Sequence, residues 1–271
     1  MNLKIKNVSL SIKGRLLVND VSITVNPGEV VGLMGPNGAG KTTTFNLTVG
    51  NIKPDKGEVL MNGKNITNLP LPIRSRLGLG YLTQEASIFR NLTVKENIDL
   101  ALQNSSYSPA AIRNRREQLI NEFNLNRFVD NYGYQLSGGE RRRCEIARAL
   151  TVGRKGPKYL LLDEPFAGID PLAVNDLKQL ILKLSGDGVG ILITDHNVRE
   201  TLLITNNSYV LSEGKILAFG SSSELADNPI VKKYYLGDNF KLWDLFEKKI
   251  KTLFIKDLLI KEWFKLLFDC Y

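Results

Sequence analysis

Gly35-Pro36-Asn37-Gly38-Ala39-Gly40-Lys41-Thr42 is the stretch of this 271-residue chain that decides its fold. A short apolar run, Val30–Met34, precedes it, and a helix is expected at residues 42–49. Glycines allow successive backbone N–H groups to turn inward, and the positive end of the helix points at the same place. The stretch therefore predicts a phosphate site between a buried strand and a helix. We assign phosphate binding to Gly35, Pro36, Asn37, Gly38, Ala39, Gly40, Lys41, Thr42 and Thr43.

The spacing is that of a P-loop, with a glycine, four residues and then Gly-Lys-Thr. In such a loop the lysine approaches the β- and γ-phosphates, and the hydroxyl of Thr42 faces Mg²⁺. An accidental glycine-rich turn is the alternative, and average composition gives a chance match in roughly one such chain in a hundred. The loop alone does not choose between kinases, GTPases, helicases and transport ATPases.

The bulk composition predicts a globular protein of a reducing, cytosolic compartment. No apolar run of 18 residues is present, and the first ten residues lack the apolar core of a secretory signal. The two cysteines, Cys144 and Cys270, match no metal or redox spacing. The formal net charge is +8, but the densest basic run, residues 141–143, is too short for a nucleic-acid patch. We therefore expect solvated charge near lipid headgroups and no nucleic-acid partner.

Strand and turn patterns predict an α/β fold with a parallel core and an antiparallel edge. Val21, Ile23 and Val25 alternate as in a half-buried strand, whereas the run before the P-loop suits a strand covered on both faces. Asn62-Gly63 is a hairpin signal, and a second hairpin is expected at residues 212–215. Further buried strands are expected at residues 159–162 and 190–194, with a helix between them near residues 172–184.

A helical insert is expected at about residues 86–155. Thr93 and Glu96 have the spacing of a capping box, and Ser108-Pro109 places proline at a first helical position. We divide the chain into a nucleotide-binding domain at residues 1–240, which includes this insert, and an amphipathic tail at 241–271. Apolar residues recur in the tail at roughly helical spacing between lysines, which fits a helix on a membrane or partner. The alternative is a segment that folds back on its own domain or is poorly ordered.

Two carboxylates, Asp163 and Glu164, end the apolar run at residues 159–162. Downstream of a P-loop, Asp163 is placed to hold Mg²⁺, and Glu164 could act as the general base on the attacking water. The alternative is a strand that simply ends at a polar loop.

Leu136-Ser137-Gly138-Gly139-Glu140 precedes an expected helix at residues 141–150. Ser137 and Glu140 have capping-box spacing. Two glycines in a first helical turn are costly unless something approaches the backbone closely, and a phosphate at the helix start would supply that reason.

This LSGGE stretch between the P-loop and the acidic strand resembles the signature of ABC-type nucleotide-binding domains. The resemblance covers about residues 1–240 and implies a P-loop NTPase fold with a RecA-like core, an antiparallel β subdomain and a helical signature subdomain. It identifies Gln84 as the Q-loop glutamine that touches Mg²⁺ and water. It places Asp170 in the D-loop and makes His196, the only histidine in the chain, the switch residue at the γ-phosphate. Without that context, a lone histidine is more often structural.

The resemblance also implies ATP and Mg²⁺ as ligands and a head-to-tail homodimer. In this family, ATP lies between the P-loop of one subunit and the signature of another, here Ser137, Gly138, Gly139 and Glu140. Integral membrane subunits would be further partners. A soluble ABC ATPase on ribosomes or DNA, and a P-loop phosphotransferase, are the competing classes, but the latter leaves LSGGE without a role.

One position departs from the family pattern. Many members place an aromatic residue before the P-loop to stack on adenine, and the residue that aligns with it here is Ile12. We therefore expect stacking to be lost or replaced by apolar contact.

Within the family, residues 81–90, 164–171 and 194–201 are similar to those of ATPases of lipopolysaccharide export. That likeness implies a peripheral protein on the cytoplasmic face of the inner membrane, and it places Phe89 and Arg90 where the membrane partner docks. The ATPase of branched-chain amino-acid importers is the alternative.

Overall fold

The computed structural model describes residues 1–103, 108–153, 156–237 and 240. It divides into two compact units, Met1–Ser222 and Ser223–Tyr271. The amphipathic tail expected at 241–271 lies outside the described residues, and the domain division at residue 240 stays a prediction. Within the described part of the chain, no helix has the length and apolarity needed to cross a membrane.

A six-stranded sheet in the order β10-β9-β3-β8-β7-β6 forms the centre of the first unit. Its strands are β3 Val30–Met34, β6 Leu79–Leu82, β7 Tyr159–Asp163, β8 Gly190–Thr194, β9 Asn207–Ser212 and β10 Lys215–Gly220. All neighbours are parallel except β9 and β10. Every residue of β3, β7 and β8 is buried, as expected for parallel strands covered on both faces. The predicted parallel core is confirmed.

A second, antiparallel sheet has the order β2-β1-β4-β5. Its strands are β1 Leu3–Ile12, β2 Arg15–Val25, β4 Lys56–Met61 and β5 Lys64–Asn65. Asn62 and Gly63 both have positive φ, 53° and 80°, as a type I′ hairpin requires. Glu213 and Gly214 repeat this geometry between β9 and β10. Both predicted hairpins are therefore confirmed.

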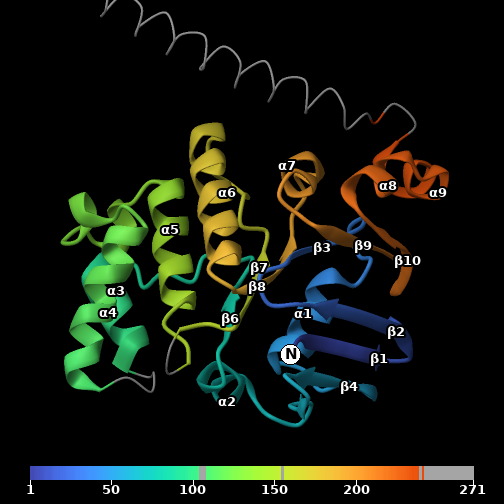
Figure 1. The fold of residues 1–271 in the computed structure, drawn as a ribbon, viewed down its shortest axis with the longest axis horizontal. Coiled ribbons are helices and arrows are strands. Elements are labelled where there is room, and N and C mark those ends of the chain that lie inside the picture. Colours follow the sequence, from blue (N-terminus) through green and yellow to red (C-terminus); the bar gives the residue numbers. More distant parts are fainter. Residues whose placement is uncertain (104–107, 154–155, 238–239, 241–271) are drawn as a thin grey trace, which may run out of the picture. The chain divides into compact units, whose positions relative to one another are not determined.

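Helices cover the central sheet on both faces. In β7, Leu160 and Leu162 belong to a core shared with α3 to α6, whereas Leu161 belongs to a core shared with α1 and the antiparallel sheet. Figure 1 shows α3, α4 and α5 standing together at one end of this unit and β1, β2 and β4 at the other. The helices are α1 Lys41–Val49, α2 Leu71–Arg76, α3 Val94–Gln103, α4 Pro109–Glu122, α5 Gly138–Ala149, α6 Pro171–Gly186 and α7 Val198–Leu202.

The predicted helix starts at Thr93 and Ser108 are confirmed. The carboxylate of Glu96 accepts the Thr93 backbone N–H at 2.7 Å, and Ser108 accepts the Ala111 N–H at 3.3 Å. Short 3₁₀ turns, Asn126–Phe128 and Gly133–Gln135, connect α4 to α5. The second unit contains most of α8 Ser222–Asp227, the short α9 Pro229–Val231 and a π turn, Lys232–Leu236.

The parallel order fixes where chemistry can occur. The P-loop follows β3, Gln84 follows β6, Glu164 follows β7 and His196 follows β8. The carboxyl ends of parallel strands share one edge of a sheet, so these four segments meet there.

A buried arginine holds the far end of the P-loop helix. The Arg74 guanidinium donates to the carbonyls of Leu47 and Thr48, in the last turn of α1, at 2.9 and 2.6 Å. It also donates to the carbonyls of Leu69 and Thr67. Burial lowers its pKa to about 10, so the group stays charged at neutral pH. The carboxyl end of a helix favours such a cation.

We predict that Arg74→Ala lowers the free energy of unfolding by about 3 kcal/mol, because it leaves several buried carbonyls without a donor. Urea denaturation followed by circular dichroism measures this. The control is Arg76→Ala, an exposed arginine on the same helix, which should change stability by about 0.5 kcal/mol or less. Equal effects of the two changes would contradict the capping role of Arg74.

Candidate active site

Two glycines of the P-loop are required by close backbone contacts. Gly35 has φ 145°, and a Cβ there would lie 2.1 Å from the Leu211 carbonyl oxygen. Gly40 has φ 103°, and its Cβ would lie 2.7 Å from the Leu17 carbonyl oxygen. Any other residue at either position would strain the loop and collide with it. The loop is thus wrapped tightly between β2 and the end of β9.

Lys41 lies over the loop that it follows. Its Nζ donates to the Gly35 and Pro36 carbonyls at 2.7 and 3.0 Å. Burial lowers its pKa, and the carboxylates of Glu164 and Asp163 act in the opposite direction. A phosphate oxygen can replace these neutral acceptors with a charged one, which binds an ammonium more strongly.

Asp163 is a fully buried carboxylate, and neither of its oxygens makes a hydrogen bond of normal geometry within the described part of the chain. The Tyr81 phenol lies close to it, and burial together with this carboxylate raises the pKa of Tyr81 to about 12. Burial raises its pKa to about 6; the Glu164 carboxylate adds to the rise, and Lys41 and Arg142 oppose it. The neighbouring Thr194 hydroxyl is likewise buried and unpaired among these residues. Such a costly arrangement fits a site for a cation.

Glu164 and His196 form a pair at the mouth of the cleft. Glu164 has φ 51°, a left-handed conformation that is uncommon for a side chain of its size. Its backbone N–H donates to the Thr194 carbonyl at 2.8 Å, which holds the turn. Glu164 Oε1 lies 2.7 Å from His196 Nε2, so the imidazole N–H donates a hydrogen bond to the carboxylate. Glu164 is nearly buried, while the imidazole is half exposed.

Asp195 was not predicted as a site residue, yet it organises this pair. It is buried and accepts the Phe166 N–H at 2.9 Å and the Asn197 N–H at 2.8 Å. Burial raises its pKa, and these two N–H groups act against the rise. The carboxylate thereby ties the loop after β7 to the loop after β8.

One cleft of about 480 Å³ brings together the three predicted catalytic residues and six of the nine predicted phosphate residues, without Gly35, Pro36, Ala39 or the predicted metal ligand Asp163. It is lined by Arg15, Leu17, Asn37, Gly38, Gly40, Lys41, Thr42, Thr43, Gln84, Glu164 and His196. Ser137 and Asp170 are not among these residues. Ser137 caps α5, because its hydroxyl accepts the Glu140 backbone N–H at 3.4 Å, while Glu140 Oε2 accepts the Ser137 N–H at 2.8 Å. Asp170 caps α6 by accepting two backbone N–H groups at 3.0 Å. These bonds lower the Asp170 pKa.

The signature glycines have a reason inside the chain itself. A Cβ on Gly138 would lie 2.7 Å from the Gly168 carbonyl oxygen, and one on Gly139 would lie 2.8 Å from the Ala173 Cβ. Close packing of α5 against the start of α6 therefore requires both glycines. The close approach to this backbone that the sequence predicts is confirmed, and it is made by the chain itself. A phosphate at the same helix start stays a prediction.

Arg142 connects the signature helix to the catalytic loop. This buried guanidinium donates to the carbonyls of Asp163 and Glu164 at 2.9 and 2.6 Å. It also donates to the Thr83 carbonyl, next to Gln84, at 3.1 Å. Its ion-pair partner, Glu145, accepts the N–H groups of residues 87 and 88 at 2.7 and 3.1 Å. The sequence suggested only a solvated basic run here, and the spacing of residues 142 and 145 on one helix face was the signal that could have revealed the network.

Phe89 and Arg90, the expected coupling residues, lie on the surface next to this network. Phe89 is 45% exposed, and the Arg148 guanidinium stacks 4.7 Å from its ring centroid. Arg148 also donates to the Ser87 carbonyl at 2.6 Å. An exposed aromatic ring is thus held in a fixed orientation.

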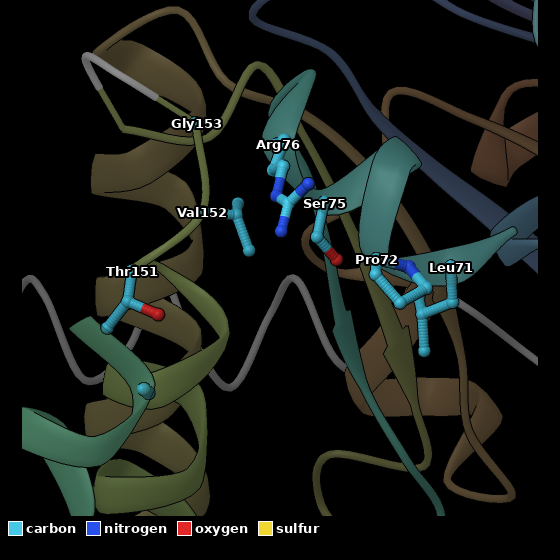
Figure 2. Close-up of a pocket in the computed structure, with 8 residues that line it drawn as sticks. Leu71, Pro72, Ser75, Arg76, Thr151, Val152 and Gly153 are labelled. Atoms are coloured by element: carbon cyan, nitrogen blue, oxygen red, sulfur yellow. The ribbon is translucent and has the colours of Figure 1, made fainter. Parts of the chain in front are cut away.

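A second hollow, of about 370 Å³, lies between α2 and the segment that follows α5. Figure 2 shows Leu71, Pro72, Ser75 and Arg76 on one side and Thr151, Val152 and Gly153 on the other. Its lining contains no carboxylate, histidine or cysteine. It therefore offers no acid–base or metal chemistry, and the P-loop cleft is the candidate active site.

The fold and this cleft define a P-loop ATPase domain. A family model described as ABC transporter matches residues 18–167. The lipopolysaccharide export system ATP-binding protein LptB of Haemophilus influenzae is 50% identical over 238 residues, which cover 88% of this chain and 98% of that protein. This chain therefore belongs to the ABC transporter family and is an ATPase of that family.

Solved structures agree. MJ1267, an ATP-binding cassette of an ABC transporter in its ADP conformation, has a TM-score of 0.78 at 28% identity, over 88% of this chain and 100% of that one. The dimeric post-hydrolysis structure of the cassette MJ0796 bound to ADP and Pi has a TM-score of 0.70 at 27% identity, over 81% and 98%. The predicted fold class is confirmed.

We predict that Asp163→Asn stabilises the nucleotide-free protein while abolishing hydrolysis. Burial raises the pKa of this carboxyl to about 6 in the folded chain, so ionisation there costs up to about 3 kcal/mol relative to the unfolded chain. That cost is complete above pH 6 and fades as the pH falls toward 4. The gain from the substitution, about 1–3 kcal/mol, should follow the same pH course in urea denaturation.

The control for this change is Asp187→Asn at the exposed end of α6, where no such gain is expected. Destabilisation by Asp163→Asn at pH 8 would show that the buried carboxylate has a structural partner.

Proposed function

We propose that this chain is the ATP-hydrolysing subunit of a lipopolysaccharide exporter, held peripherally at the cytoplasmic face of the inner membrane. The observation that carries the proposal is the 50% identity to the lipopolysaccharide export protein LptB over 98% of its length. One edge of the central sheet carries the phosphate loop together with Asp163, Glu164 and His196. This arrangement supports ATP hydrolysis as the reaction that drives export.

Mg²⁺ fits the site, because Asp163 offers two buried oxygens without partners. Asp163, Thr42 and Gln84 would hold the ion. When bound, Mg²⁺ neutralises the charge that develops on the β- and γ-phosphates. The ionised form of Asp163 would then have a cation as its partner.

Hydrolysis needs a base beside the γ-phosphate. Glu164 accepts a proton from the attacking water, and His196 orients its carboxylate through the 2.7 Å contact. Lys41 moves from its loop carbonyls to the phosphate oxygens and balances their charge. The left-handed backbone conformation of Glu164 is strained, and it orients the carboxylate that acts as general base.

A second copy of the chain would complete each site. Ser137 does not line the cleft of its own chain, and one chain has one P-loop and one signature helix. The cassette MJ0796 is dimeric with ADP and Pi, which supports the same arrangement here. Two copies related head to tail would place the α5 start of each copy at the γ-phosphate of the other.

Integral membrane subunits would dock at Phe89 and Arg90. The ring of Phe89 is exposed and held by Arg148, and the adjoining residues 87 and 88 are hydrogen-bonded to Glu145. Glu145 is paired with Arg142, and Arg142 donates to the backbone carbonyl of Glu164. A displacement of this surface by a bound membrane subunit would therefore be transmitted to the backbone of the catalytic base.

We predict that Glu164→Gln binds ATP but lowers turnover by at least about a hundredfold, because the amide cannot accept the proton of water. The variant should also accumulate as an ATP-bound dimer in size-exclusion chromatography with light scattering. Normal turnover in this variant would remove Glu164 from the mechanism.

The control for the dimer combines Glu164→Gln with Ser137→Arg. This protein should still bind ATP at its P-loop and remain monomeric, because the added side chain blocks the signature turn. A stable ATP-bound dimer of the double variant would contradict the composite site.

We predict that the tagged full-length chain, purified from native membranes, brings integral membrane proteins with it. In lipid vesicles, lipopolysaccharide should stimulate the ATPase activity of that complex several-fold, and leucine should not. Replacing both Phe89 and Arg90 by alanine should release the chain from the complex and leave its ATPase activity in solution intact. Phe219→Ala, at another exposed ring, is the control and should not release it. Stimulation by leucine alone, or recovery with ribosomes, would overturn the proposal.

A further inference from the structure

Two clefts flank the P-loop, and the same residues of β2 line both of them. Beside the catalytic cleft lies a second one of about 520 Å³. Arg15 and Leu17 line both clefts, together with residues 37 and 38 of the loop. No tryptophan, tyrosine, phenylalanine or histidine lines the second cleft, and His196, at the phosphate end, is the only aromatic ring in the first.

The base of a bound nucleotide must rest against one of these walls. Its phosphates bind the loop, and the ribose links them to a base only a few bonds away. A purine is a flat, apolar surface that gains binding energy when another flat group stacks on it. Of the side chains shared by the two clefts, only Arg15 is planar, cationic and long enough to cover such a surface.

The guanidinium of Arg15 is available for this role. The side chain is exposed, and within the described ranges no carboxylate lies at ion-pair distance from it. Ile12, the residue that aligns with the family's aromatic position, is 44% exposed and lines neither cleft. Ile12 is paired directly with Arg15 across the β1–β2 hairpin, so the two side chains share one face.

We infer that Arg15 holds the purine base by stacking its guanidinium on the ring, with Leu17 as the apolar floor. On this inference, the base is still stacked although the aromatic residue is absent. The stacking group is Arg15, on the strand opposite Ile12 in the hairpin. A guanidinium stacked face to face on a purine contacts the π face that all purines share, and its in-plane N–H groups do not point at the edges of the base. The chain should accordingly bind adenine and guanine nucleotides with similar affinity.

The test measures binding of ADP, GDP and inorganic pyrophosphate to the full chain with Mg²⁺ by titration calorimetry. We expect the Kd values for ADP and GDP to agree within about threefold. Arg15→Ala should raise the Kd for ADP about five- to tenfold and change the Kd for pyrophosphate less than about twofold. Arg15→Lys keeps the charge without the plane and should not restore ADP binding. Lys13→Ala, in the same hairpin turn but lining neither cleft, is the matched control.

Arg15→Trp gives an independent readout. The new indole should restore ADP binding, and ADP should quench its fluorescence, whereas pyrophosphate should not. The unsubstituted chain, which has two tryptophans elsewhere, supplies the baseline.

Several results would overturn the inference. Equal weakening of ADP and pyrophosphate by Arg15→Ala would make Arg15 a phosphate ligand. An unchanged Kd for ADP, full rescue by lysine, or ADP binding a hundredfold tighter than GDP would also exclude base stacking. These measurements involve no membrane subunit, so they are separate from the test of the exported cargo.

Discussion

The guanidinium of Arg142 is the interaction on which the site depends. It is buried, and a buried charge is costly unless every donor finds an acceptor. Here it meets backbone carbonyls from the end of β7 and from the Q-loop, as well as the carboxylate of Glu145. Two loops that would otherwise be independent, the one after β6 and the one after β7, are thereby fixed to one helix. Removing this side chain would take a donor from each of these carbonyls and leave the Glu145 carboxylate without its counter-charge.

Near Arg142, the site contains residues whose environment or backbone conformation lowers the stability of the folded chain. Asp163 is ionisable and buried without a hydrogen bond, and Glu164 occupies a left-handed backbone conformation. Such positions persist only where the surrounding structure holds them. The fully buried strands β3, β7 and β8 provide that rigidity, and Arg74 and Arg142 secure the helices next to them. The sheet edge is therefore a strained site on a rigid support.

The sequence predicts the local features well. The two Asx/Glx-Gly hairpins, the Ser108 and Ser137 caps and the P-loop each depend on residues within a few positions of one another. The order of the chain then places Gln84, Glu164 and His196 at one sheet edge. Long-range contacts are different. The spacing of residues 142 and 145 indicates a pair on one helix face but not the loops that Arg142 binds. Nothing local shows that Gly138 faces the Gly168 carbonyl or that Arg15 lines the nucleotide cleft. Such roles arise only when distant segments pack.

Arg142 also determines how two copies would communicate in the proposed dimer. The helix that starts at Ser137 would face the nucleotide of the partner, while Arg142, on that same helix, binds the backbone of Glu164 in its own chain. In that dimer, a phosphate bound at the start of α5 would act on the catalytic loop of the other site through this one helix. The proposed docking surface at Phe89 joins the same contacts through Glu145, so nucleotide and membrane partner would both act on this buried guanidinium.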